Sequence, residues 1–136
     1  MDTTRNVWEE ELTSYLAAHP KVILAFLFGS FAKGKCGAGS DVDLAVHLLV
    51  PYSEQDVASV WGRLEEITHR DVDLVVLNTA PPGIAWTSMR GKVLVDKDPK
   101  FHLELMLQRS GEAEDFREFV TTFLHERRRR CNSLST

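Results

Sequence analysis

KVILAFLFGSFAKGKCGAGSDVDLAVHLLV, residues 21–50, predicts two strands joined by a glycine-rich loop. Residues 21–28 are almost wholly apolar, which is typical of a strand buried on both faces. Residues 29–40 hold four glycines and two serines and read as a loop. Residues 41–50 read as the next strand, which ends before Pro51. Because the connection is short, the two strands can pair antiparallel, so we expect a mixed sheet.

The spacing of apolar residues outside this stretch predicts the remaining elements. A capping box of Ser53 and Asp56 indicates the start of a second helix. Helices are expected from the possible caps Thr3 and Thr4 to Pro20, from Ser53 to Ile67, over 84–90 and from about 99 to 130. Two further strands are expected over 71–77 and 92–95. The expected fold class is α/β (α+β), a mixed sheet of about four strands with helices packed mainly on one side.

The size of the chain predicts one domain. At 136 residues and 15.4 kDa it is long enough for one core, so residues 1–130 are expected to form a single domain and residues 131–136 a disordered tail. The two cysteines, Cys36 and Cys131, have neither a metal-ligand spacing nor a disulfide framework. No signal peptide and no apolar run of roughly 20 residues is present, so we expect a cytoplasmic protein without a membrane partner.

The charge balance does not favour a nucleic-acid partner. Sixteen Lys and Arg stand against 20 Asp and Glu, a net charge of −4. The basic run Arg127–Arg130 is interpreted as a solvated helix end, where cations suit the helix dipole. A contact with RNA or an acidic partner is the alternative interpretation.

Two Asp-x-Asp patterns carry the candidate chemistry. Asp41 and Asp43 are one residue apart on a predicted strand, so both carboxylates face the same side. Their apolar flanks make ionised aspartates costly unless they are solvated or bind a hard metal ion. Asp71 and Asp73 repeat the pattern, and adjacent strands would bring three or four carboxylates to one edge, as in two-metal phosphoryl chemistry. The alternatives are a solvated strand start for Asp41 and Asp43, and a turn position for Asp71.

Gly29 and Ser30 directly follow the first buried strand. A glycine there lets the backbone approach a phosphate, and the serine hydroxyl is a further donor. Taken alone the pair indicates only a turn, and the chain has neither a P-loop nor a G-x-G-x-x-G motif. Lys33 is interpreted as an exposed loop lysine rather than a phosphate ligand.

The arrangement of these motifs resembles a known family. GSFAKGKCGAGSDVDLAV, residues 29–46, has the nucleotidyltransferase signature of Gly-Ser, ten intervening residues and Asp-x-Asp. DVDLVVLNTAPPGIAWTSMRGKVLV, residues 71–95, is similar to minimal nucleotidyltransferase (MNT) proteins, in which a carboxylate in a Val-Asp-Leu-Val context precedes a Pro-containing helix and an Arg-Gly turn. The resemblance spans residues 21 to about 98.

The resemblance implies a DNA polymerase β-like nucleotidyltransferase fold that uses ATP and Mg²⁺. Carried over by position, Gly29 and Ser30 would bind the nucleotide triphosphate, and Asp41 and Asp43 would bind Mg²⁺. Asp73 would complete the metal site and help to deprotonate the acceptor hydroxyl. The three aspartates are thus both the catalytic and the metal-binding candidates, and Asp71 is given no role.

Small MNT proteins resemble the antitoxins of type VII-like toxin–antitoxin systems, namely the HEPN/MNT (HepT/MntA) systems. This implies a protein adenylyltransferase that transfers AMP to a tyrosine hydroxyl of a HEPN ribonuclease toxin, neutralises it and forms a hetero-oligomer with it. Two other hypotheses stay open. In the first, the chain is a non-catalytic antitoxin that binds the toxin. In the second, it is a nucleotidyltransferase that acts on a small molecule or an RNA end.

Overall fold

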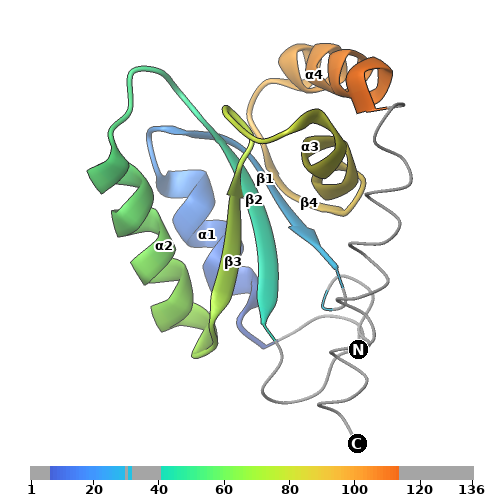
Figure 1. Ribbon diagram of the computed structural model, residues 1–136. Helices are drawn as coiled ribbons and strands as arrows, with labels where there is room; N and C mark the ends of the chain where they lie inside the picture. Colours follow the sequence, from blue (N-terminus) through green and yellow to red (C-terminus); the bar gives the residue numbers. More distant parts are fainter. Residues whose placement is uncertain (1–6, 30, 32–40, 114–136) are drawn as a thin grey trace, which may run out of the picture.

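The computed structural model describes residues 7–29, 31 and 41–113, and these contain four helices and four strands (Figure 1). In chain order these are α1 (Glu9–Ala18), β1 (Val22–Phe28), β2 (Val42–Leu48), α2 (Glu54–Thr68), β3 (Val72–Val76), α3 (Pro82–Met89), β4 (Lys92–Asp96) and α4 (Pro99–Ala113). The predictions that concern Thr3, Thr4, Ser30, Lys33, Cys36, Arg127–Arg130, the tail 131–136 and the end of the domain at residue 130 fall outside the described residues. None of the described helices is both long and apolar enough to cross a bilayer.

The strands form one mixed sheet, as the sequence predicts. Its order is β3-β2-β1-β4. β1 pairs antiparallel with both β2 and β4, whereas β2 pairs parallel with β3. The parallel pair follows from the connection, because α2 carries the chain back along the sheet between β2 and β3. β2 and β3 therefore begin at the same end of the sheet, next to the end of β1.

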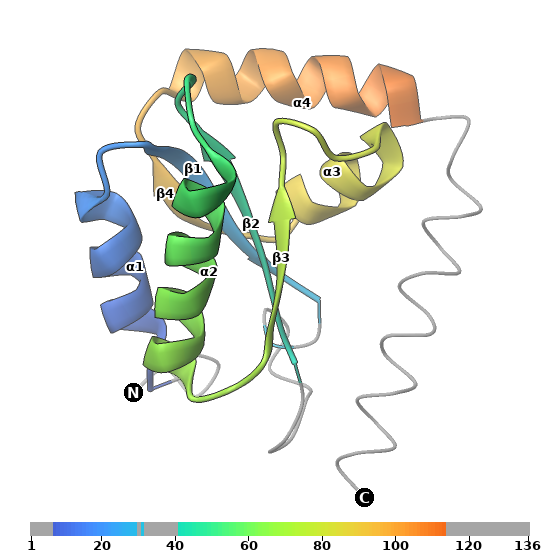
Figure 2. The same cartoon turned by 60° about the vertical axis from the view of Figure 1, so that its left-hand side comes forward.

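The helices cover both faces of the sheet, which corrects the expectation that they pack mainly on one side. α1 and α2 lie against one face, and α3 and α4 lie against the other (Figure 2). The reason is in β1, where Ala25 and Leu27 belong to the core under α1 and α2 while Phe26 and Phe28 belong to the core under α3 and α4. A strand that is apolar on both faces needs a cover on both.

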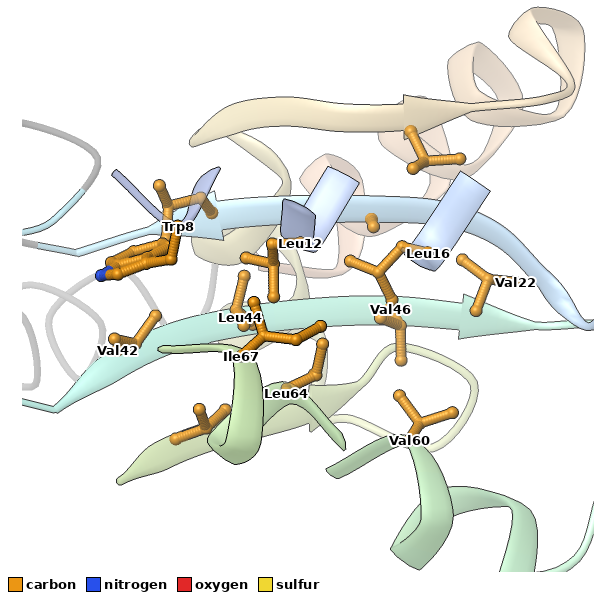
Figure 3. Close-up of a cluster of buried hydrophobic side chains, with 14 of the residues drawn as sticks. Trp8, Leu12, Leu16, Val22, Val42, Leu44, Val46, Val60, Leu64 and Ile67 are labelled. Carbon is orange, nitrogen blue, oxygen red and sulfur yellow. The ribbon is translucent and has the colours of Figure 1, made fainter. Parts of the chain in front are cut away.

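The larger core lies between the sheet and the pair α1–α2. Figure 3 shows Leu12 and Leu16 of α1 and Leu64 of α2 gathered around Leu44 and Val46 of β2. Trp8, at the N-terminus of α1, extends this core toward the end of the sheet at which β2 begins. This packing holds the two helices rigidly behind the strands that carry the aspartates.

α2 begins with the capping box that the sequence predicts. Ser53 Oγ accepts a hydrogen bond from the Asp56 N–H (3.1 Å), and Asp56 Oδ2 accepts one from the Ser53 N–H (2.8 Å). The Ser53→Ala variant should lower the free energy of unfolding by about 1 kcal/mol, because an amide of the first turn loses its partner. Chemical denaturation measures this change. The matched control is Ser59→Ala, an exposed site inside the same helix, which should leave stability unchanged or slightly higher.

His47 of β2 makes stability depend on pH. Burial, and secondly the charge of Arg109, lower the pKa of His47 below its ordinary value, and its ring lies 4.8 Å from that of Phe101. The unfolded chain therefore binds a proton at His47 more readily than the folded chain does. Acidification from about pH 7 to 5 should reduce the stability of the wild type more than that of the His47→Gln variant. Urea unfolding at several pH values measures the difference. The pKa of His19 is also lowered, but its effect on stability cancels in the comparison because the wild type and the variant both contain His19. Parallel pH profiles for the two proteins would contradict the assignment.

Candidate active site

Two of the predicted carboxylates lie side by side on the parallel strand pair. Asp43 of β2 and Asp73 of β3 are direct partners in the register. Neighbouring strands are about 4.8 Å apart, and partners in a parallel pair project to the same face. Asp41 immediately precedes β2 and shares that face by the two-residue period. Asp43 and Asp73 are thus neighbours across the strand pair, and Asp41 lies directly before β2 at the same end of the sheet.

The site lies on the face of the sheet that α3 and α4 cover. Ala45, two residues after Asp43, belongs to the core beneath these helices. Asp43 is only 4% exposed, whereas Asp41 and Asp73 are half-buried. Because buried charges in proteins are paired or bind cations, Asp43 occupies the costliest position of the three. Asp71 differs from them, since it is exposed and its backbone carbonyl accepts a hydrogen bond from the Val42 N–H (2.9 Å).

Gly29 packs directly against the buried carboxylate. Its φ is +72°, and a Cβ built at this residue would overlap Asp43 Oδ2. Phe28, the residue before it, pairs across the sheet with Asp43. A side chain at position 29 is therefore excluded twice, by the backbone conformation and by the contact with the carboxylate. Ser30, the second residue of the predicted phosphate-binding pair, is outside the described residues.

Gly91 is a second close contact at this end of the sheet. It joins α3 to β4, and a Cβ there would overlap Leu27 O and lie 2.7 Å from Phe28 Cβ. The turn after α3 is thus pressed onto the last two residues of β1, directly before Gly29. Sequence reasoning gave Gly91 no role in the site. The available signal was the Arg-Gly turn within the family resemblance.

Phe31 is also part of the surroundings of the site and has no role in the sequence predictions. It is 4% exposed, its ring lies 5.7 Å from that of Trp8 at 62°, and the Arg70 guanidinium lies 5.0 Å from its ring centroid. An isolated aromatic residue in a glycine-rich loop gives no sequence signal for these contacts. An open cavity of about 480 Å³ lies beside Arg70 and is also lined by Glu65, His69 and Asp71.

The donor set fits a magnesium ion that is shared with a phosphate ligand. Within residues 7–29, 31 and 41–113, no three His, Cys, Asp or Glu side chains form a ready-made metal site. Mg²⁺ is usually held by one or two carboxylates together with substrate phosphates and water, rather than by an all-protein cage. The paired carboxylates of Asp43 and Asp73, with Gly29 leaving the space beside Asp43 free of a side chain, provide this kind of partial site.

The contact between Gly29 and Asp43 can be tested by stability. Gly29→Ala should lower the free energy of unfolding by about 1–3 kcal/mol, because alanine is strained at positive φ and its methyl group displaces the carboxylate. Gly62→Ala is the matched control, since a Cβ there meets nothing within 4 Å and the site is inside α2. That variant should gain about 1 kcal/mol from helix propensity. A Gly29→Ala protein as stable as the wild type would contradict the described contact.

Several solved structures with a similar fold are toxin–antitoxin structures. The chain is similar to a protein in a toxin–antitoxin structure with AMP-PNP, with 21% identity and a TM-score of 0.67 over 86% of this chain and 96% of the other. It is similar to a protein in an MntA–HepT toxin–antitoxin structure, with 18% identity and a TM-score of 0.64 over 90% and 97%. A third match is a complex of tri-AMPylated HEPN toxin with MNT antitoxin from Shewanella oneidensis, with 17% identity and a TM-score of 0.61 over 87% and 97%. At these identities the likeness demonstrates a shared fold.

Sequence comparison identifies the family. A search of curated proteins found no match. A model of the family described as "Polymerase beta, Nucleotidyltransferase" matches residues 10–100, which is more than half of the chain and includes Gly29, Asp41, Asp43 and Asp73. The family resemblance noted in the sequence is confirmed at this level, and the chain belongs to the polymerase beta nucleotidyltransferase family.

Proposed function

We propose that the chain is a cytoplasmic antitoxin that acts as a Mg²⁺-dependent protein adenylyltransferase, transferring AMP from ATP to a tyrosine of a HEPN-family toxin. The observation that carries the proposal is the pairing of Asp43 with Asp73 beside Gly29, in a chain of the polymerase beta nucleotidyltransferase family. Support for the donor and the partner comes from the similar solved structures, of which one contains AMP-PNP and another a tri-AMPylated HEPN toxin. The toxin would form a hetero-oligomer with this chain.

Each residue of the site has a role in this proposal. Gly29 and Ser30 bind the triphosphate through backbone N–H groups and the serine hydroxyl. Asp41, Asp43 and Asp73 are the ligands for Mg²⁺, which when bound neutralises phosphate charge and orients the phosphate oxygens. Asp73 also accepts the proton of the acceptor hydroxyl, since it lies on the outer strand of the pair and is more exposed than Asp43.

The proposed reaction is a nucleotidyl transfer. The tyrosine oxygen forms a bond to the α-phosphorus of ATP, and the bond from that phosphorus to the oxygen bridging the α- and β-phosphates breaks. Pyrophosphate leaves with the electron pair of that bond, and the hydroxyl proton passes to Asp73. The products are tyrosine-linked AMP and pyrophosphate. The task of the protein is to hold the attacking and leaving oxygens in line, which is the main source of catalysis in phosphoryl transfer.

The decisive variant is Asp43→Asn, tested with the purified chain, Mg²⁺, a HEPN-family toxin, and ATP labelled at either the α or the γ phosphate. The wild type should transfer label to the toxin only from the α position. Asp43→Asn should reduce this transfer by about 100-fold or more, because the amide keeps the shape of the side chain but loses the charge. Glu66→Gln, an exposed site on α2, is the control and should retain full transfer.

The same experiment separates the competing hypotheses. Undiminished transfer by Asp43→Asn would refute the proposed site. Inhibition of the toxin without label from either position would show a non-catalytic antitoxin that acts by binding. Label on RNA or on a small molecule, and none on the toxin, would assign a different acceptor to the same site.

A further inference from the structure

The residue after the predicted phosphate-binding pair is held in place by two aromatic contacts. Phe31 is 4% exposed and belongs to the core formed with α1 and α2. Its ring meets the Trp8 ring edge-to-face, with centroids 5.7 Å apart, and Trp8 is itself only 8% exposed. Such aromatic pairs add to the stabilisation that burial provides. Phe31 is therefore a fixed point immediately downstream of Ser30.

Arg70 makes the second contact with the Phe31 ring. Its guanidinium lies 5.0 Å from the centroid of the Phe31 ring, within the range of a cation–π interaction. Arg70 occupies the short connection between α2 and β3, so it lies three residues before Asp73. The guanidinium thus links the residue after Ser30 to the strand that carries the third aspartate.

The backbone around Arg70 is held by hydrogen bonds. The Arg70 carbonyl accepts one from Thr68 Oγ1 (3.4 Å), and the Asp71 carbonyl accepts one from the Val42 N–H (2.9 Å). The Val72 N–H donates to Glu65 Oε2 (3.0 Å). These bonds connect the segment to α2 and to β2, so the Arg70 side chain extends from a rigid base.

Taken together, these contacts hold both neighbours of Ser30. Gly29, before it, is packed against Asp43, and Phe31, after it, is packed between Trp8 and Arg70. We propose that Phe31 and Arg70 are positioning residues that pre-organise the backbone at Gly29 for binding of the ATP triphosphate. This inference rests on the proposed function, because it assigns the pair to the binding of that nucleotide.

Pre-organisation predicts a particular kinetic effect. Without the Phe31–Arg70 contact the backbone at Gly29 would occupy its binding conformation for only part of the time, and the apparent affinity for ATP would fall in proportion to that fraction. Saturating ATP restores the binding conformation, so kcat should stay close to the wild-type value while KM rises. A general loss of folding would instead lower the amount of active protein and the melting temperature.

The chain contains a matched control pair. Arg63 of α2 lies over the Tyr15 ring of α1, with its guanidinium 5.7 Å from the ring centroid. This is the same type of contact, here between the helices α2 and α1, and it involves neither Gly29 nor Phe31. Removing it measures the effect of losing an Arg–aromatic contact as such.

The experiment compares Arg70→Met and Phe31→Leu with Arg63→Met, using AMP transfer from ATP to the toxin and direct binding of a non-hydrolysable ATP analogue. Arg70→Met and Phe31→Leu should each raise KM for ATP, and the Kd of the analogue, by about three- to tenfold. Arg63→Met should leave both constants unchanged. Arg70→Lys and Phe31→Tyr keep a cation over a ring and should restore most of the affinity. The melting temperature of each variant is measured in parallel.

The double variant Arg70→Met/Phe31→Leu distinguishes positioning from direct contact. If the two residues act as a pair, the double variant should weaken binding no more than either single variant. A loss in Arg70→Met alone would show instead that Arg70 touches the nucleotide directly, and would overturn the proposal. Unchanged binding in both single variants, or an equal loss in Arg63→Met, would also overturn it.

The outcome is separable from that of the proposed function. If the wild type transfers no AMP to the toxin, the proposed function fails. Binding of the ATP analogue still reports on the Phe31–Arg70 pair, because it needs neither an acceptor nor the chemical step.

Discussion

The parallel pairing of β2 with β3 is the constraint on which the candidate site depends. Because side chains alternate between faces along a strand, a slip of one residue in this register would place Asp43 and Asp73 on opposite sides of the sheet. The register is fixed at both ends. At the start, the Asp71 carbonyl accepts a hydrogen bond from the Val42 N–H, and beyond the strand ends the Asn78 side chain bonds the N–H and carbonyl of Leu48 at 2.9 and 2.8 Å.

The connection through α2 reinforces this register. Trp61 Nε1 donates to the Val72 carbonyl (2.7 Å), and Glu65 Oε2 accepts from the Val72 N–H (3.0 Å). Both polar groups of the first residue of β3 are therefore bonded to side chains of the preceding helix. As a result, α2 also determines where β3 begins. It thereby sets the position of Asp73 along the strand, opposite Asp43.

Local patterns in the sequence were sufficient to predict the sheet and the aspartates but not their surroundings. The short connection between the first two strands is a local feature, and the antiparallel pairing predicted from it is confirmed. The placement of helices on both faces was mispredicted, although the apolar run in β1 contained the reason for it. The contacts of Phe31 with Arg70 and of Gly91 with Leu27 join residues far apart in the sequence, so no local pattern indicates them.

The charges around the site explain why the proposed activity requires a divalent cation. A triphosphate brought next to Asp41, Asp43 and Asp73 would meet carboxylates of its own sign, and repulsion between such groups increases as water is excluded. Two cations in the described part of the chain, Lys92 and Arg70, have partners within the protein. Lys92 pairs with Glu9 at 2.6 Å, and Arg70 lies over the Phe31 ring. Lys92 and Arg70 thus serve to hold the scaffold, and in the proposed function Mg²⁺ would neutralise the charge of the phosphates.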